Sequence, residues 1–558
     1  MEVYFIGEKQ IFDNSLIKTC DIEYVYNYLK DKSEISIDIE TTKLDLKYEE
    51  SGLDPHTSKI VMLQIGDLEK QFVIDTRFQN IDIIKDLLSN SSIVKVGHNL
   101  KFEYKHIYHN YGIILENLYD TQIVEEILNC GIKNVEFGLK ALVKRYLNIE
   151  LEKDTRLEFL KIKDKPFTTT QILYGAKDIL YPLEIKKLQE EKIIKQQLQS
   201  CVDLEMKFIP VLGDIEYKGM NFNTQKWIEI YNRNKPLLHK QSRILDQYVV
   251  DNYLNSPFIK QQMDLFITTP QCNIKWTSTQ QVVAFLKYLN ACPQEVSKQT
   301  KKLEYTSNAV LLKSSLNGIN KDKNLKFKQF VEDFIKFKEL EQSCTTFGLD
   351  FFKYINPKTK RIHTNFKQIL NTGRISSKNP NLQNIPSEEE YRKCFDASVG
   401  FKIVNADYSG QEQIVLVNKS QDEGLIKFYK DNLGDMHSYV ASKIFKEISH
   451  LSLDDIKKLH KDKRQIAKSA GFAINYGGNG YTIAKNIGVS TEQGEEVYNA
   501  YFNAFPGLKN YFEKVQKQAI QRGYILIDTL THRKSYFTKP RDNKELHAIY
   551  KKALNYPK

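Results

Sequence analysis

The sequence has no apolar run that approaches the roughly 18 residues a membrane-spanning helix needs. Its N-terminus, MEVYFIGEKQIFDNS, lacks the apolar core of a secretory signal peptide and the Arg- and Ser-rich character of a transit peptide. The seven cysteines are scattered and form no Cys-x-x-Cys pair, which fits a reducing compartment and argues against a zinc site. These absences exclude a membrane protein and a disulfide-rich secreted domain, and they predict a soluble intracellular protein.

The length and the charge distribution indicate several domains with different partners. A chain of 558 residues exceeds the roughly 250–300 residues that one core usually supports. Residues 1–200 carry 27 Lys and Arg against 33 Asp and Glu, whereas the rest of the chain carries 54 against 37. We therefore expect the second part to bind a polyanion and the first to gather carboxylates, although excess lysine often serves only solubility.

A short segment in the acidic part places two carboxylates side by side. Residues 36–41 read as a strand, so that Asp38 and Glu40 point to the same face. Neighbouring carboxylates repel each other unless a cation lies between them, and a pair of Mg²⁺ ions is the usual arrangement for phosphodiester cleavage. An exposed edge strand with alternating charge is the alternative interpretation.

Three later segments favour the metal site. Residues 96–103 read as a strand that turns into a helix presenting Glu103, and Asp120 opens another helix, where it caps the helix or supports the structure. Tyr174 and Asp178 lie one helical turn apart and therefore share a face. A phenol beside a metal-binding carboxylate is suited to orienting an attacking water.

Together, the segments DIET, HNLKFE and YGAKD resemble the 3′–5′ proofreading exonuclease domain of family A DNA polymerases, over roughly residues 30–190. The resemblance implies a ribonuclease H-like fold in which the metal ligands are Asp38, Glu40 and Asp178. It also implies that Tyr174 orients the water and that Asn99 contacts DNA or the frame of the site. The family usually has Asp in place of Glu103. We expect an active exonuclease, with an inactive DNA-holding remnant as the alternative.

In the basic part, four side chains recur every four residues and predict a helix with all of them on nearly one face: Arg464, Lys468, Phe472 and Tyr476. Two cations suit a triphosphate and two rings suit a sugar and a base, although a surface helix with a half-buried aromatic edge has the same spacing. RQIAKSAGFAINYGG resembles the nucleotide-binding helix of family A polymerases. By this resemblance the two cations bind the β- and γ-phosphates, and Lys468 protonates the leaving pyrophosphate. Phe472 stacks on the sugar, and Tyr476 covers the templating position.

A second polymerase motif begins with IVNAD at 403–407, which predicts an apolar strand that ends in a carboxylate. By resemblance, Asp407 binds both catalytic metals with help from the carbonyl of Tyr408, and Glu412 blocks a 2′-hydroxyl. Asp-Met-His at 435–437 resembles a family segment that makes His437 a triphosphate contact. The chain departs from the usual pattern around Glu412 at three positions: Gly410, Gln411 and Ile414.

The segment TGRISSKNPNLQNIP at 372–386 is rich in turn formers and in amide and guanidinium donors, which suit acceptors in the minor groove. By resemblance, Arg374, Gln383 and Asn384 contact the primer–template. Asn555 lies in an Asn-x-Pro sequence that resembles the start of the next family helix and is a further DNA contact.

The second catalytic carboxylate of the family, in a His-Asp-Glu hairpin, has no counterpart in this sequence. Without that hairpin the strand at 403–407 would expose an apolar edge. We therefore expect the polymerase site to be completed by a missing C-terminal segment or a partner chain. Phage genomes often arrange polymerases in this way, so a phage-type enzyme in the cytoplasm of a bacterial host is expected.

The expected fold is α/β plus α: a ribonuclease H-like exonuclease at residues 1–200, followed by a right-hand polymerase. Its thumb would span 201–345, the N-terminal part of its palm 346–420, and its fingers 421–558. The expected function is DNA-templated DNA polymerisation with proofreading, with primer–template DNA, dNTPs and Mg²⁺ (or Mn²⁺) at both sites. One alternative is a 3′–5′ exonuclease with a DNA-clamping, polymerase-like region. The other is a non-enzymatic primer–template binding subunit.

Overall fold

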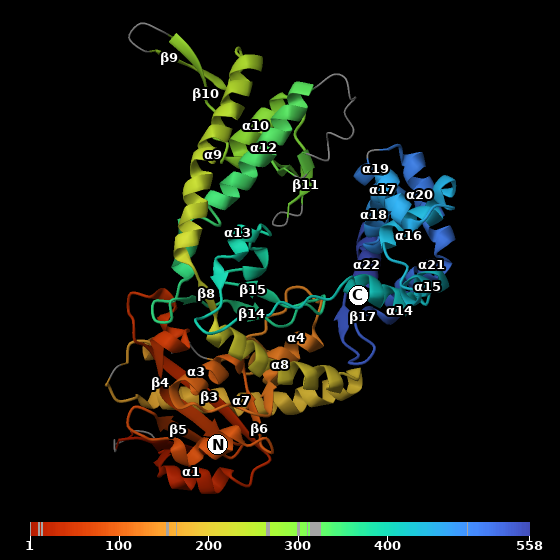
Figure 1. Cartoon of the computed structure of the whole chain (residues 1–558). Coiled ribbons are helices and arrows are strands. Elements are labelled where there is room, and N and C mark those ends of the chain that lie inside the picture. Colours follow the sequence, from red (N-terminus) through yellow and green to blue (C-terminus); the bar gives the residue numbers. More distant parts are fainter. Residues whose placement is uncertain are drawn as a thin grey trace. The chain divides into compact units, whose positions relative to one another are not determined.

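The computed structural model describes residues 2–8, 12, 15–151, 156–162, 164–263, 268–297, 302–309, 311–312, 325–487 and 489–557. Contacts divide the chain into two units (Figure 1). Unit 1 is made of residues 1–221, 354–384 and 515–558, and unit 2 of residues 222–353 and 385–514. None of the described helices is both long and apolar enough to span a membrane. The division into exonuclease, thumb, palm and fingers stays a prediction.

A seven-stranded mixed sheet forms the centre of unit 1, in the order β2-β1-β5-β4-β3-β6-β7. Its strands are β1 (Glu2–Ile6), β2 (Ile17–Thr19), β3 (Glu34–Lys43), β4 (Ser58–Gly66), β5 (Lys70–Asp75), β6 (Val94–Gly97) and β7 (Leu118–Asp120). β3 pairs antiparallel with β4 and parallel with β6, so it lies inside the sheet. Nearly continuous burial along β4 and β5 shows that these strands are covered on both faces.

Four helices of unit 1, α1, α4, α7 and α22, begin where a short polar side chain caps them. Asp120 accepts hydrogen bonds from the first-turn amides of α4, and Thr168 forms a capping box with Gln171 at the start of α7. α7 crosses β3 to β6. The helices are α1 (Ile22–Leu29), α2 (Lys85–Ser89), α3 (Lys101–Tyr111), α4 (Thr121–Leu128), α5 (Leu139–Leu147), α6 (Arg156–Phe159), α7 (Thr169–Gln196), α8 (Gln199–Lys218) and α22 (Asn543–Asn555).

Two segments that are distant in sequence fold against α8 within unit 1. One contains the hairpin of β14 (Asn365–Lys367) and β15 (Ser376–Lys378), and the other that of β17 (Tyr524–Leu526) and β18 (Lys534–Tyr536). Arg533, just before β18, forms a buried ion pair with Glu205 of α8. Nearby, β13 (Arg361–Ile362) pairs with β8 (Met220–Phe222). Unit 1 is therefore held together by contacts between segments hundreds of residues apart.

Unit 2 contains two helical groups. In the first, α9 packs along α12 around aromatic side chains that include Trp276, Phe285 and Phe330. In the second, α18 packs against α16 and α19. The helices are α9 (Thr224–Asn252), α10 (Thr279–Tyr288), α12 (Leu325–Cys344), α13 (Glu389–Arg392), α14 (Gln411–Ser420), α15 (Glu423–Lys430), α16 (Met436–Ile444), α17 (Leu453–Leu459), α18 (Lys461–Asn475), α19 (Gly480–Ile487), α20 (Thr491–Ala504) and α21 (Pro506–Arg522), which continues into unit 1.

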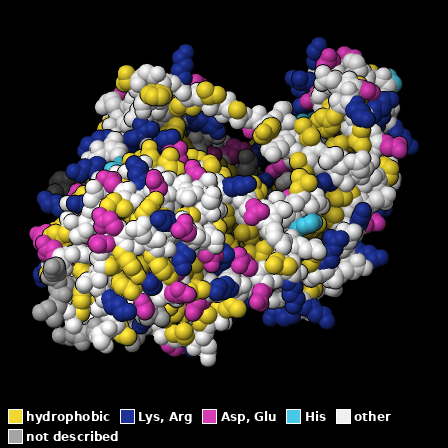
Figure 2. Space-filling view, turned by 90° about the horizontal axis from the view of Figure 1, so that it is seen from below, with side chains coloured by type: hydrophobic (Ala, Val, Ile, Leu, Met, Phe, Trp, Pro, Cys, Tyr) yellow, Lys and Arg dark blue, Asp and Glu magenta, His cyan; other side chains and the backbone are white. Residues whose placement is uncertain are grey.

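Short elements complete the described chain. The strands are β9 (Ile259–Met263), β10 (Thr268–Cys272), β11 (Gln294–Val296), β12 (Leu303–Tyr305) and β16 (Phe395–Asp396). The 3-10 helices are η1 (Glu49–Gly52), η2 (Pro55–Thr57), η3 (Asp82–Ile84), η5 (Leu349–Tyr354), η6 (Leu382–Asn384) and η7 (Lys446–Ile448). On the face seen in Figure 2, acidic and basic side chains are interspersed over most of the surface.

The predicted strand at 403–407 is wrong. Residues 401–408 form neither a helix nor a strand, and all of them are exposed. A strand is stable only when a neighbour satisfies its backbone groups, and no described strand pairs with this segment. Apolar sequence alone was therefore an insufficient signal here.

Asp54, at the start of η2, joins this turn to a distant segment of unit 1. Its Oδ2 accepts hydrogen bonds from Thr57 Oγ1 at 2.8 Å and from Asn356 Nδ2 at 2.6 Å. Burial opposes the charge on Asp54, but these hydrogen bonds and that of His56 lower its pKa to about 2. The carboxylate is therefore more favourable in the folded than in the unfolded chain.

Replacing Asp54 should make unit 1 less sensitive to acid. Because the folded pKa lies below the ordinary 3.8, the contribution is present above about pH 4 and is lost as the pH falls through 2. We expect Asp54→Asn to lower the unfolding free energy by about 2 kcal/mol at pH 6, and by much less at pH 2. Denaturant titrations at both pH values, with the exposed Asp31→Asn as control, measure this; an equal loss at both would contradict it.

Candidate active sites

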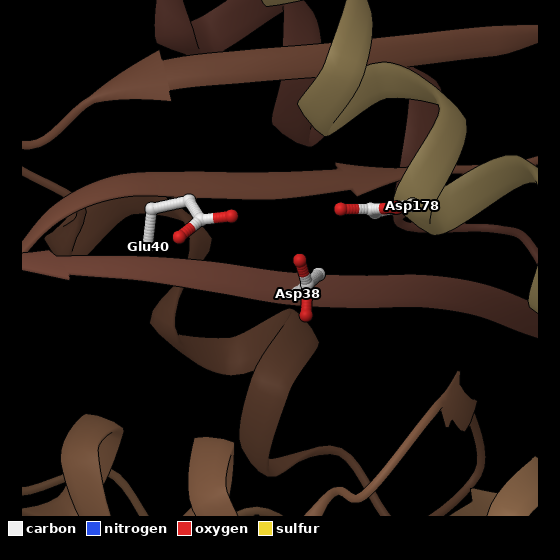
Figure 3. Close-up of side chains that lie close together, drawn as sticks. All are labelled: Asp38, Glu40 and Asp178. Atoms are coloured by element: carbon white, nitrogen blue, oxygen red, sulfur yellow. The ribbon is translucent and has the colours of Figure 1, made fainter. Parts of the chain in front are cut away.

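Three carboxylates of unit 1 converge on one point (Figure 3). Asp38 and Glu40 lie two residues apart on β3, and Asp178 lies on α7. One oxygen from each lies within 4.8 Å of the others. Strand alternation directs the first two to one face, and the packing of α7 across β3 brings in the third. The three residues that the sequence analysis grouped therefore lie together, and their role as metal ligands stays a prediction.

The donor set of this cluster fits a divalent cation. Carboxylate oxygens are the ligands that Mg²⁺ and Mn²⁺ prefer, and three negative charges this close repel one another without a cation. Asp38 and Asp178 are partly exposed, so the site is open to solvent on one side, whereas Glu40 is buried. In the part of the chain that the structure describes, no other group of three His, Cys, Asp or Glu side chains comes together in this way.

Two further predicted residues flank the cluster. Tyr174 lies on α7 one turn before Asp178, with its ring 6.4 Å from that of Phe159. Glu103 lies in the first turn of α3 and is 3% exposed. Burial and the neighbouring Asp38 carboxylate raise the pKa of Glu103 well above its ordinary value. Glu103 thus lies beside Asp38 but is not one of the three carboxylates that converge.

Asp120 frames this site, as the sequence suggested. Its oxygens accept the backbone amides of Asn99 at 3.1 Å and Leu100 at 2.7 Å, and also those of Gln122 and Ile123 in α4. The same carboxylate thus caps α4 and holds the turn between β6 and α3. Asn99 has a φ of 68°, a left-handed conformation that asparagine tolerates better than most residues. That one residue performs both tasks was not evident from the sequence.

In unit 2, the predicted stripe lies along α18, with Tyr476 as its C-terminal cap. The Tyr476 hydroxyl donates to Glu412 Oε2 at 2.8 Å, and the Phe472 ring lies 6.2 Å from that of His437. Both aromatic side chains of the stripe remain about half exposed. Four of the residues predicted to bind nucleotide therefore form two contacting pairs. Their roles in binding stay predictions.

Asp435 is a residue of this site to which the sequence analysis gave no role. It caps α16 by accepting the amide of Ser438, and it accepts two hydrogen bonds from Arg464, both at 2.8 Å. The Arg464 guanidinium holds the pKa of Asp435 well below its ordinary range. The only signal in the sequence was its place as the first residue of the Asp-Met-His segment. The pair fixes the direction of the Arg464 side chain.

Most of the remaining predicted residues are exposed, whereas Asn555 is partly buried. Asp407 and Tyr408 are exposed on segment 401–408, and Arg374 and Asn384 are exposed near η6. The Gln383 carboxamide accepts the amide of Ser377 at 3.2 Å. At the end of α22, the buried Oδ1 of Asn555 has no hydrogen-bond partner among the described residues. The predicted roles of these residues remain open.

A carboxylate cluster on a mixed sheet, set before a helical part with a cationic and aromatic stripe, is the arrangement of a nucleic-acid enzyme with a metal-dependent nuclease site. The chain matches "DNA polymerase family A" over residues 259–557 and "3′-5′ exonuclease" over residues 17–193. The chain belongs to DNA polymerase family A and carries a 3′–5′ exonuclease domain ahead of its polymerase domain.

Similar proteins include DNA polymerase I of Borreliella burgdorferi, which is 28% identical over 96% of this chain and 56% of its own length. DNA polymerase I of Caldicellulosiruptor bescii is 26% identical over 94% of this chain and 56% of its own length. The chain thus spans about half the length of the curated relatives it matches. The polymerase domain of Pol1 from M. smegmatis, solved with a DNA primer-template and dNTP, superposes with a TM-score of 0.74. That match covers 96% of this chain and 84% of the other at 21% identity, and it shows a shared fold.

Removing the Asp120 carboxylate should destabilise unit 1 strongly. Asp120→Ala leaves four backbone amides without their acceptor at a buried position, which we expect to cost roughly 3 kcal/mol or more. A matched control is Asp21→Ala, because Asp21 is an exposed cap that accepts only the Tyr24 amide in α1. Denaturant unfolding of both variants tests this, and equal losses would show that burial of Asp120 adds nothing.

Proposed function

We propose that this chain is a DNA-templated DNA polymerase with a 3′–5′ proofreading exonuclease, and that primer–template DNA and dNTPs are its substrates. Family membership and the exonuclease domain support both activities. The observation that carries the proposal is the convergence of Asp38, Glu40 and Asp178. In addition, the M. smegmatis protein with the same fold binds the two substrates proposed here.

In the exonuclease, Asp38, Glu40 and Asp178 hold Mg²⁺, with Mn²⁺ as a substitute. These carboxylates would hold the ion where its charge would lower the pKa of a bound water and offset charge on the phosphodiester oxygens. Tyr174, one turn from Asp178, orients the attacking water through its hydroxyl. Glu103 supports Asp38 from α3, and Asp120 holds the turn that starts this helix. The glutamate at 103 is therefore compatible with a working site, because it reaches the catalytic carboxylate.

In the polymerase, the stripe of α18 binds the incoming nucleotide. Arg464, oriented by Asp435, and Lys468 attract the triphosphate, and Lys468 protonates the leaving pyrophosphate. The exposed ring of Phe472 is available to the sugar. The hydrogen bond between Tyr476 and Glu412 holds the carboxylate that excludes a 2′-hydroxyl. Arg374, Gln383, Asn384 and Asn555 contact the DNA.

The polymerase site also needs the metal ligand Asp407 on a strand. Val399, Phe401 and Val404 are 101%, 76% and 89% exposed, so residues 399–404 present apolar side chains to water. These side chains would be covered if the segment paired with another polypeptide segment, either from the C-terminal part of the same protein or from a partner chain. That segment supplies the second catalytic carboxylate.

The exposed position of Asp407 also favours a second candidate function for these 558 residues, a 3′–5′ exonuclease with a DNA-clamping, polymerase-like region. A labelled primer–template with Mg²⁺, with and without dNTPs, separates the two. Primer extension by this chain would refute the hypothesis of an exonuclease with a DNA-clamping region. It would also show that the polymerase site needs no other polypeptide segment. Shortening without extension would support the clamp for the isolated chain, and extension only with an added C-terminal polypeptide would support the two-part polymerase.

The double variant Asp38→Ala/Glu40→Ala should abolish 3′–5′ degradation, because two of the three converging carboxylates are lost. DNA binding should be unchanged, since it depends on other surfaces. Degradation of a labelled single strand and binding by fluorescence anisotropy measure the two effects. The matched control is Glu34→Gln, at the start of the same strand but outside the cluster. Persistent degradation would place the metal site elsewhere.

Lys468→Ala should weaken the binding of a fluorescent dNTP by about 10-fold or more, because one of the two cations of the α18 stripe is lost. Degradation of single strands should be unaffected. Lys458→Ala, an exposed cation on α17, is the control and should bind normally. If Lys468→Ala reduced degradation instead, the assignment of two separate sites would be wrong.

A further inference from the structure

Helix α3 presents two different faces. Glu103 in its first turn lies beside Asp38 of the candidate nuclease site. Lys101 and Lys105, one turn apart, instead reach a single carboxylate on α8, that of Glu216. The nuclease site and this ion cluster are therefore attached to the same helical turn.

Glu216 is the centre of a buried network. The Lys101 ammonium lies 2.6 Å from Oε1, and the Lys105 ammonium lies 2.7 Å from Oε2. The Glu216 side chain is only 1% exposed, and those of the lysines are 17% and 11% exposed. Burial opposes the charge on Glu216, but the two ammonium groups hold its pKa below the ordinary value. Two cations thus share one anion, which makes removal of the anion costly.

The same network also binds the backbone of strand β14. Glu216 Oε1 accepts the backbone amide of Phe366 at 2.6 Å, and the Lys101 ammonium donates to the Phe366 carbonyl at 2.5 Å. Phe366 is the central residue of β14, opposite Ser377 of β15. The pair Lys101–Glu216 therefore satisfies both backbone groups of Phe366, as a neighbouring strand would.

Beyond β14, hydrogen bonds continue to the proposed DNA contacts. Ser377 donates its amide to the Gln383 carboxamide, and its hydroxyl accepts the amide of Leu382 at 2.8 Å. Thr364 Oγ1 donates to the Pro380 carbonyl at 2.8 Å. The loop 380–384 is thereby fixed to the hairpin, and the hairpin to α3. All these residues belong to unit 1.

We propose that Glu216 is a positioning residue that holds the primer–template loop 380–384 at a fixed position relative to helix α3 of the nuclease site. In this position, a frayed primer end bound to the loop reaches Asp38, Glu40 and Asp178. This inference rests on the proposed exonuclease function. Glu216 touches neither DNA nor the reacting atoms. Its effect is confined to primer ends delivered from a duplex, because a free single strand enters the nuclease site without using the loop.

The test compares two substrates, a short single strand and a primer–template with a mismatched 3′ end. For Glu216→Gln we expect kcat and KM on the single strand within about 2-fold of the parent, and degradation of the mismatched primer slowed about 10-fold or more. Asp214→Asn is the matched control, since Asp214 lies on α8 and pairs with the exposed Lys218. It should leave the ratio of the two rates unchanged.

Glu216→Gln leaves two buried cations without their anion and is expected to lower the melting temperature. The variant Lys101→Met/Lys105→Met/Glu216→Leu removes all three charges together, and it should show the same selective loss with the fold intact. The inference would be overturned if a folded variant showed an unchanged ratio of the two degradation rates, or equal losses of rate on both substrates. Either result would leave the proposed exonuclease function standing. Failure of the parent chain to degrade either substrate would instead refute the proposed exonuclease, and this inference with it.

Discussion

The cost of burying a charge organises unit 1. Three buried carboxylates of unit 1 are each held by groups that include at least one other segment of the chain: Asp120 by four backbone amides, Glu205 by Arg533 and Gln368, and Glu216 by two lysines and the amide of Phe366. An unsatisfied buried charge would cost several kcal/mol, so these partners must come together as the chain folds. Segments 354–384 and 515–558 are thereby tied to the sheet that carries the nuclease residues.

The cluster of Asp38, Glu40 and Asp178 carries the chemistry proposed for this unit. Its three oxygens lie within 4.8 Å and face a point open to solvent on one side. Like charges at this distance are tolerated when a divalent cation binds between them. The fold thus holds its structural carboxylates with its own groups and brings the carboxylates of Asp38, Glu40 and Asp178 close enough to share a cation. The same logic appears in unit 2, where Asp435 holds Arg464 while the aromatic side chains of α18 remain accessible.

Features that depend on local periodicity were predictable from the sequence. The two-residue spacing of Asp38 and Glu40, the four-residue spacing along α18 and the helix beginning at Asp120 are all present. Features that depend on a distant partner were not. Nothing near Asp435 or Glu216 in the sequence indicates Arg464 or the two lysines of α3. The strand expected at 403–407 is absent for the same reason. Strand formation depends on a pairing partner, which the local sequence does not reveal.

The central claim is that the converging carboxylates of unit 1 form a cation site. Diffraction from crystals of this chain soaked in Mn²⁺, recorded at the manganese absorption edge, tests it most directly. The account predicts anomalous density bounded by Asp38, Glu40 and Asp178, and its disappearance in crystals of the Asp178→Asn variant. Manganese bound only elsewhere, or density that persists unchanged in the variant, would contradict the account.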